Sequence, residues 1–142
     1  MNIWVNGCFD IIHTGHIELL WYAKNYQPGD VYPIFTPTNF LFVGLDTDER
    51  VKQLKGDKRP INNINTRLTI MKNLKMVDEV FIFNTDNDLR QLVKDNNIDY
   101  MIVGDQYRNK EVIGSENARL GVVFYRVDGR SSTNIIEKIK NL

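Results

Sequence analysis

Short apolar runs alternate with helical segments along this chain, and that alternation limits the fold more than any other feature of the sequence. The runs cover residues 3–5, 41–45, 80–83, 100–103 and 122–125. Because they lack a strict alternation of apolar and polar side chains, they are typical of parallel strands buried on both faces. Strands that alternate with helices then predict an α/β fold, a doubly wound, Rossmann-like parallel sheet with helices on both faces.

The segments between these runs show the spacing of amphipathic helices. Ile17, Leu20 and Trp21 stand at i, i+3 and i+4, which predicts a helix over residues 14–26 with these side chains on one face. Similar patterns predict helices near residues 47–54, around a stripe of Ile70, Met71, Leu74 and Val77, around Leu89, Leu92 and Val93, and over residues 131–142 with Ile135, Ile136 and Ile139 facing the core.

Length and composition fit one domain, residues 1–142, in the cytoplasm. The 18 basic and 18 acidic residues balance, so the chain has no overall attraction for nucleic acid or anionic membranes. No apolar run approaches the roughly 20 residues of a membrane helix. The single cysteine, Cys8, cannot form an internal disulfide, which fits a reducing compartment. We interpret Cys8 as a small residue at a strand end rather than as a nucleophile.

The strongest chemical signal is the decapeptide GCFDIIHTGH at residues 7–16. A strand ends and a helix begins within it, so backbone N–H groups and the positive end of the helix dipole point beyond the strand. His13 and His16, the only histidines of the chain, are three residues apart and can lie on one side of the helix start. Gly15 between them permits close approach of a ligand. This pattern indicates a phosphate site.

Two other interpretations of the histidine pair are weaker. Zinc would need further ligands, and the chain has no HExxH, no CxxC and no third histidine. A purely structural role suits a lone histidine better than two that flank a glycine at a strand-to-helix turn.

The decapeptide resembles the signature of the cytidylyltransferase-like nucleotidyltransferases, Gly-x-Phe-Asp-x-x-His-x-Gly-His, at every fixed position. This HxGH resemblance implies that His13 and His16 bind the triphosphate of a nucleotide and stabilise charge at its α-phosphorus. It also implies nucleotide contacts from Gly7, Phe9, Asp10 and Gly15.

A basic loop, KGDKRPIN, covers residues 55–62 and precedes Arg67. By itself such a charge run is usually a solvated surface. Its spacing, however, is similar to the heptose-1-phosphate adenylyltransferase (ADP-heptose synthase) branch of the family. That resemblance implies that Lys55 and Arg67 are catalytic cations that bring two anionic substrates together, with Lys58 and Arg59 as weaker candidates for acceptor binding.

Two later segments extend the resemblance. Gly104 and Asp105 follow a predicted strand, where ligands bind in open α/β sheets, although a plain turn also explains them. The adenylyltransferase branch usually has Lys-Gly-Gly-Asp-Tyr here, whereas Val-Gly-Asp-Gln-Tyr is closer to the cytidylyltransferases. Three hydroxyl residues open the last helix as an N-cap and a candidate triphosphate site. The resemblance implies nucleotide contacts from Arg126, Ser131, Ser132 and Thr133, and an acceptor contact from Arg130.

These motifs predict a nucleotidyltransferase. An acceptor phosphate would attack the α-phosphorus of an NTP in line and release pyrophosphate, with Mg²⁺ bound mainly through the NTP phosphates. The branch resemblance favours ATP and a sugar phosphate such as heptose 1-phosphate. CTP with glycerol 3-phosphate, or with another polyol or amino-alcohol phosphate, is the first alternative. A non-catalytic nucleotide-binding module is the second.

Residues 32–40, YPIFTPTNF, form an apparent insertion relative to the family. The segment suits a loop over the site, an edge hairpin or a subunit contact, and its simplest interpretation is a loop packed on its own domain. Because the family is commonly dimeric, we expect a homodimer. A monomer in light scattering would contradict that expectation.

Overall fold

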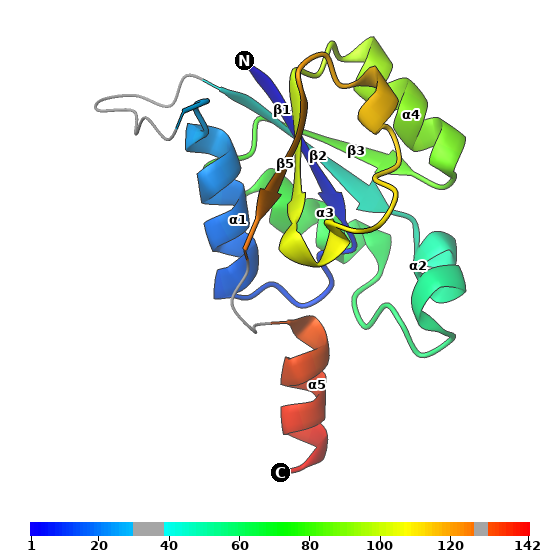
Figure 1. The fold of residues 1–142 in the computed structure, drawn as a ribbon. Coiled ribbons are helices and arrows are strands. Elements are labelled where there is room, and N and C mark those ends of the chain that lie inside the picture. Colours follow the sequence, from blue (N-terminus) through cyan, green and yellow to red (C-terminus); the bar gives the residue numbers. More distant parts are fainter. Residues whose placement is uncertain (30–38, 127–130) are drawn as a thin grey trace.

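Five parallel strands form one sheet within the residues that the structure, a computed structural model, describes: 1–29, 39–126 and 131–142 (Figure 1). The strand order β3-β2-β1-β4-β5 changes direction between β1 and β4, which is where ligands bind in doubly wound sheets. This order confirms the predicted fold class. The strands are β1 (Asn2–Gly7), β2 (Phe40–Asp46), β3 (Glu79–Phe83), β4 (Tyr100–Gly104) and β5 (Gly121–Tyr125).

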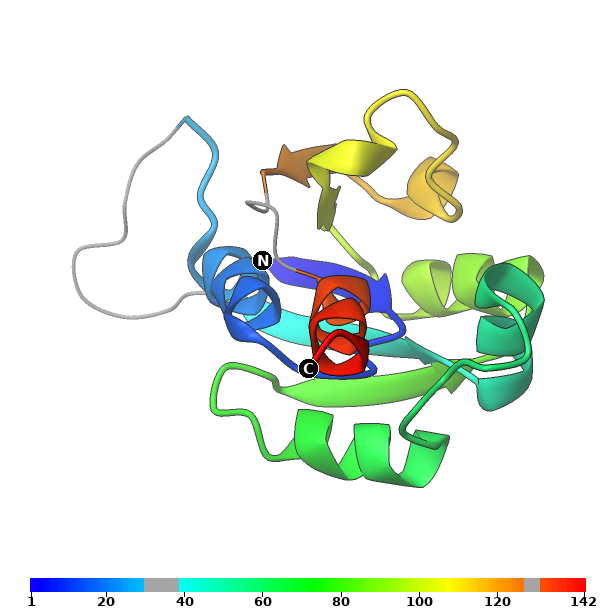
Figure 2. The same ribbon diagram turned by 90° about the horizontal axis from the view of Figure 1, so that it is seen from below.

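Helices cover both faces of this sheet, and α1 and α4 lie on opposite sides of it (Figure 2). None of the described helices is long and apolar enough to cross a membrane. The α-helices are α1 (Thr14–Asn25), α2 (Asp48–Lys55), α3 (Ile64–Lys72), α4 (Asp86–Asp95) and α5 (Ser132–Lys140), and two short 3-10 helices follow β4, η1 (Asp105–Tyr107) and η2 (Ser115–Asn117).

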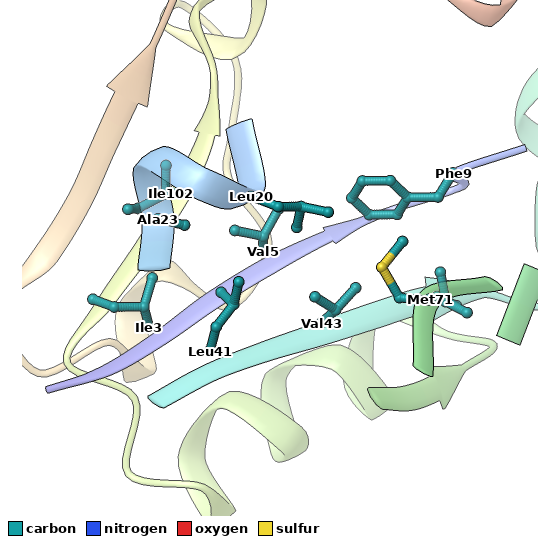
Figure 3. Packing of buried hydrophobic residues seen from close by; sticks show 10 residues of the cluster. Ile3, Val5, Phe9, Leu20, Ala23, Leu41, Val43, Met71 and Ile102 are labelled. Atoms are coloured by element: carbon teal, nitrogen blue, oxygen red, sulfur yellow. The ribbon is translucent and has the colours of Figure 1, made fainter. Parts of the chain in front are cut away.

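The core has two halves because the sheet is buried on both faces. On one face, α1 and α3 pack against β1, β2 and β4, and Figure 3 shows Val5 and Val43 of the strands among the side chains there. On the other face, α4 packs through Leu89 and Val93 against Trp4. The carboxyl ends of β1 and β4 are therefore held rigidly from both sides.

Gly44 in β2 is required for packing. A Cβ atom added there would lie 2.5 Å from Trp4 Cζ2 and 3.2 Å from Phe83 Cε1. Both rings are buried. We expect Gly44→Ala to lower the free energy of unfolding by about 1–3 kcal/mol in urea titrations. Gly7→Ala is the control for stability, because its new Cβ would meet only ordinary contacts with the Phe9 ring, at 3.4 Å or more.

The structure corrects the predicted face of α1 and the predicted end of α3. Trp21 is 55% exposed, because the core face of α1 is centred on Leu20 and Ala23. Helix α3 ends at Lys72, since Asn73 caps it, and Leu74 and Val77 follow in turns where they still pack on the core.

The predicted inward face of α5 is wrong at Ile139. This helix leaves the body of the molecule (Figure 1), and its described attachment is in the first turn, where Ser132 bonds Ile11. Ile139, farther along, is consequently 59% exposed, whereas Ile135 and Ile136 are half-buried.

The apparent insertion lies mostly outside the described residues, which resume at Asn39. Phe40 opens β2 and so belongs to the sheet. The Asn39 side chain is buried and donates hydrogen bonds to the carbonyl oxygens of Ala23 (3.2 Å) and Tyr26 (2.7 Å), which ties the start of β2 to the end of α1.

Candidate active site

A pocket of about 480 Å³ lies beyond the carboxyl ends of β1 and β4, where the strand order changes direction. This volume is within the range of small-molecule sites, roughly 300–1,000 Å³. Four parts of the chain line it: the β1–α1 loop with the start of α1, the end of α2 with the following loop, η1, and the first turn of α5. The lining residues are Asn6, Gly7, Cys8, Phe9, Asp10, His13, Gly15, His16, Leu19, Lys55, Arg59, Gly104, Gln106, Tyr107, Ser131, Ser132, Thr133 and Asn134.

His13 and His16 form a capping box at the start of α1. His13 Nδ1 accepts from the Gly15 N–H (3.0 Å), and His16 Nδ1 accepts from the His13 N–H (3.2 Å). The ring centroids are 3.8 Å apart. Because both Nδ1 atoms are acceptors, the neutral rings carry their proton on Nε2. Nε2 is therefore the donor nitrogen of each ring.

His16 is a neutral donor at physiological pH. Burial, followed by the nearby His13 and Lys55, lowers the pKa of His16 from 6.5 to about 4. The Phe9 ring, with its centroid 5.1 Å from that of His16, contributes to this burial. A neutral imidazole can donate a hydrogen bond to a phosphate oxygen without first taking up a proton.

The lowered pKa of His16 predicts a loss of stability as the pH falls from 6.5 towards about 4. In this window the unfolded chain binds a proton at this histidine and the folded protein does not, so protonation favours unfolding. Above pH 6.5 both states are neutral and there is no penalty. His16→Gln removes the titration and can keep the capping box. We expect urea titrations at about pH 7 and about pH 4.5 to show a smaller loss in this variant than in the wild type.

A comparison of variants is needed because other groups titrate in the same range. Burial raises the pKa of Asp46, which acts in the opposite direction by favouring the folded state in acid. Equal losses of unfolding free energy in wild type and His16→Gln would contradict the assignment to His16.

The first turn of α5 provides a second helix N-terminus at the pocket. Ser131 is its N-cap and accepts from the Asn134 N–H at 3.0 Å. Within the described residues, the N–H groups of Ser132 and Thr133 have no hydrogen-bond partner. The pocket thus lies between the positive ends of two helix dipoles, which favours a bound anion.

The Ser132 hydroxyl lines the pocket and is engaged with the backbone of Ile11. Its Oγ donates to the carbonyl oxygen of Ile11 (2.8 Å) and accepts from the Ile11 N–H (3.3 Å). It therefore anchors α5 to the β1–α1 loop, and the Thr133 hydroxyl is better placed than that of Ser132 to contact a phosphate.

Lys55 and Arg59 bring positive charge to the pocket. Lys55 ends α2, is exposed, and forms no ion pair among the described residues. Arg59 Nε pairs with Asp10 at 3.1 Å, and its Nη1 lies 3.4 Å from Thr133 Oγ1. Arg59 Nη2 is buried with no hydrogen-bond partner among the described residues. A phosphate oxygen in the pocket would satisfy that donor.

Asp10 holds the basic loop in place. Its carboxylate accepts from the N–H groups of Ile61 (2.8 Å) and Asn62 (2.7 Å) and from Arg59. The residue is 1% exposed although it borders the pocket. Its preceding residue, Phe9, adopts a left-handed conformation with φ 49°, which costs roughly 1–2 kcal/mol and needs support from the surroundings. A direct contact of either residue with a nucleotide stays a prediction.

The structure places some predicted site residues away from the pocket. Arg67, proposed as a catalytic cation, is 1% exposed and bonded to backbone behind the pocket. Asp105 pairs with Arg108 at 2.7 Å instead of facing the pocket. The helical spacing of the sequence could not reveal that the Arg67 guanidinium lies behind the β1–α1 loop rather than in the pocket in front of it. Lys58 and Arg126 are exposed outside the lining, and Arg130 lies outside the described residues.

Several lining residues had not been predicted. Gln106 and Tyr107 lie two and three residues after Gly104, the last residue of β4, and this position after a strand end could have identified them. No sequence pattern indicated that Asn6, Leu19 and Asn134 would line the pocket. Cys8 also lines the pocket, but burial raises the pKa of its thiol above the usual value. A protonated thiol is a poor nucleophile, in agreement with its interpretation as a small strand-end residue.

The described residues do not form a protein-only magnesium site. No group of three or more His, Cys, Asp or Glu side chains gathers among them in a way that could hold a metal ion. Asp10, the carboxylate of the pocket lining, is engaged with the basic loop. The expectation that Mg²⁺ binds mainly through the phosphates of the nucleotide stays a prediction.

Comparisons with known proteins identify the family of the chain. A family model described as Cytidylyltransferase-like matches residues 4–138. The chain is 44% identical over 138 residues to the bifunctional protein HldE of Campylobacter fetus subsp. fetus, covering 97% of this chain and 28% of that protein. It is 41% identical over 138 residues to the bifunctional protein HldE of Helicobacter pylori (strain P12), covering 97% and 27%. The chain thus spans about a quarter of the length of these curated relatives.

A solved structure supports the fold. The lipopolysaccharide core biosynthesis protein from Thermoplasma volcanium GSS1 aligns with a TM-score of 0.64 and 24% sequence identity. The alignment covers 92% of this chain and 98% of that one, so the similarity extends over the whole sheet.

Proposed function

Since the chain belongs to the cytidylyltransferase-like family and is a nucleotidyltransferase, we propose that it transfers AMP from ATP to a sugar phosphate such as heptose 1-phosphate. The observation that carries this proposal is the pocket itself. Two helix N-termini, the histidine pair and the cations Lys55 and Arg59 meet there. A triphosphate and a phosphate monoester repel each other, and this concentration of positive potential offsets the repulsion.

The transfer needs positioning and charge stabilisation rather than a protein nucleophile. An oxygen of the acceptor phosphate attacks the α-phosphorus in line. The bond from the α-phosphorus to the bridging oxygen breaks, and pyrophosphate leaves with the electron pair. The attacking oxygen is already ionised, so no general base is required. The Nε2–H groups of His13 and His16 donate to the phosphate oxygens as charge develops.

Sequence similarity supports the choice of ATP and a sugar phosphate. The basic loop matches the heptose-1-phosphate branch, and Lys55 and Arg59 of that loop line the pocket. The curated relatives are 38–44% identical over nearly the whole chain. Two cations in the same pocket as the histidine pair suit the phosphate of the acceptor.

CTP with a polyol phosphate is the second candidate. The segment after β4, Gly104-Asp105-Gln106-Tyr107, favours it, because it is closer to the cytidylyltransferase pattern, and three of these residues line the pocket. A Gln side chain can both donate and accept, so it can pair with the amino group and ring nitrogen of either adenine or cytosine.

A pyrophosphate-release assay tests these proposals. ATP and CTP are supplied separately with Mg²⁺ and a panel of sugar 1-phosphates and polyol phosphates. Release with ATP and a sugar 1-phosphate supports the main proposal, and release with CTP and a polyol phosphate supports the second. No release with any pair, together with NTP binding in a titration, would favour a non-catalytic nucleotide-binding module and contradict both.

A further inference from the structure

Arg67 lies behind the pocket, where its guanidinium joins four segments of the chain. Nη1 donates to the carbonyl oxygens of Cys8 (2.9 Å) and Asp46 (2.8 Å). Nε donates to the carbonyl oxygen of Asn62 (3.0 Å), and Nη2 to the Asp48 carboxylate (2.7 Å). All three nitrogens are engaged, and the side chain is fully buried. Arg67 is thus a cross-link between the β1–α1 loop, the end of β2, the start of α2 and the basic loop.

One of these bonds reaches the residue before the strained Phe9, and a second reaches the residue after it through Asn62. Phe9 has φ 49°, a region that a bulky aromatic residue occupies only when its neighbours hold it there. Arg67 holds the carbonyl oxygen of the residue before it. The residue after it, Asp10, is held by the N–H groups of Ile61 and Asn62, and Asn62 Nδ2 donates to the Asp10 carbonyl oxygen at 2.9 Å. Asn62 is in turn held by Arg67.

The Phe9 ring connects this cross-link to the histidines. It is buried in the core, pointing back towards Leu20 (Figure 3), and its centroid lies 5.1 Å from the His16 ring. The His16 ring contacts the rings of both Phe9 and His13. If the backbone at Phe9 relaxed, the ring would move, and His16 would lose one side of its packing.

We propose that Arg67 is a positioning residue that sets the orientation of His16 towards the substrate phosphates, because it holds Cys8 directly and Asp10 through Asn62 on the two sides of Phe9. This role differs from the predicted one, in which the guanidinium would touch an anion directly. The effect on turnover rests on the proposed function. The effect on the histidine rings does not, because it is a property of the free protein.

The test substitutes Arg67→Lys, which keeps the charge but loses the planar fork that reaches several acceptors at once. Two-bond ¹H–¹⁵N spectra of the free protein are recorded above the usual histidine pKa of about 6.5. The chain has only two histidines, so both can be followed. We expect the wild type to show the Nε2–H form at both rings, and Arg67→Lys to show a mixture of tautomers at His16. We also expect kcat to fall roughly tenfold or more, with a smaller change in KM.

Two further variants complete the design. Asn62→Ala removes only the bond to the Asp10 carbonyl oxygen and should change the His16 signals in the same direction by a smaller amount. If Arg67→Lys does not fold, the His16 signals of Asn62→Ala alone test the proposal. Arg50→Lys is the matched control, because Arg50 bonds Asp46 and Asp86 but neither neighbour of Phe9. It should leave the His16 signals unchanged.

The outcomes are distinct. A change of the His16 signals in Arg67→Lys and Asn62→Ala, but not in Arg50→Lys, supports the proposal. Unchanged signals in the first two variants overturn it, and a fall in turnover with unchanged signals would indicate direct anion contact instead. If the wild type turns over no substrate pair, the proposed function fails while the spectra still decide the role of Arg67.

Discussion

His16→Ala is expected to lower kcat about 10²- to 10³-fold while the protein keeps its fold, because the substitution removes one donor of a charge-stabilising site. His16 lies in the first turn of α1 and points its Nε2–H into the pocket, because its Nδ1 is engaged by the His13 N–H. Its loss removes one half of the capping box, which costs about 1 kcal/mol, but leaves the hydrophobic core intact. Pyrophosphate release at saturating substrate measures the effect.

His16→Gln separates two explanations of that loss. A glutamine at this position can accept from the His13 N–H through Oε1 and present its amide N–H₂ to the pocket. If His16 acts as a neutral donor, as its pKa of about 4 indicates, this variant should retain more activity than His16→Ala. Equal loss in both variants would mean that the imidazole is required for another reason, such as proton transfer. Glu18→Ala, an exposed change on the same helix, is the control.

The sheet could be predicted from the sequence because its signal is local. Each buried strand is a short apolar run, and every predicted run falls within an observed strand, as residues 41–45 do within β2. The faces of the helices were less predictable. Trp21 is apolar and correctly spaced, yet Leu20 and Ala23 occupy the core side of α1. The burial of Ile139 depends on what α5 packs against, and the spacing of residues within α5 does not determine that.

The residues of the candidate site also fall into two groups, those predicted from a contiguous stretch of sequence and those whose position depends on long-range packing. The histidine pair was predicted because a strand end, a turn and a helix start are contiguous in the sequence, and the structure places both rings in the pocket. Arg67 comes from a distant helix, and its place behind the β1–α1 loop depends on how α3 packs on the sheet. The same reasoning applies to Asp10, whose partners in residues 59–62 are about fifty positions away.

Lys55→Ala is expected to reduce kcat/KM on the order of 10²-fold, because it removes a cation that offsets the repulsion between the two phosphorylated substrates. Lys55 ends α2, and Gly56 caps that helix with φ 96°, a conformation that turns the chain into the basic loop. The exposed side chain pairs with no described acid, so its charge is available to a ligand, and unfolding free energy should not change. Varying the acceptor at saturating NTP, and then the NTP at saturating acceptor, identifies the phosphate that Lys55 contacts.

Lys58→Ala is the matched control for this prediction. Lys58 lies three residues later in the same loop and is also exposed, but it does not line the pocket. Its removal deletes the same formal charge from the chain, so any general electrostatic effect on substrate encounter appears in both variants. We expect Lys58→Ala to stay within about twofold of the wild type, as surface substitutions usually do. Similar losses in the two variants would show that the loop acts through its overall charge, and the specific role of Lys55 would then be wrong.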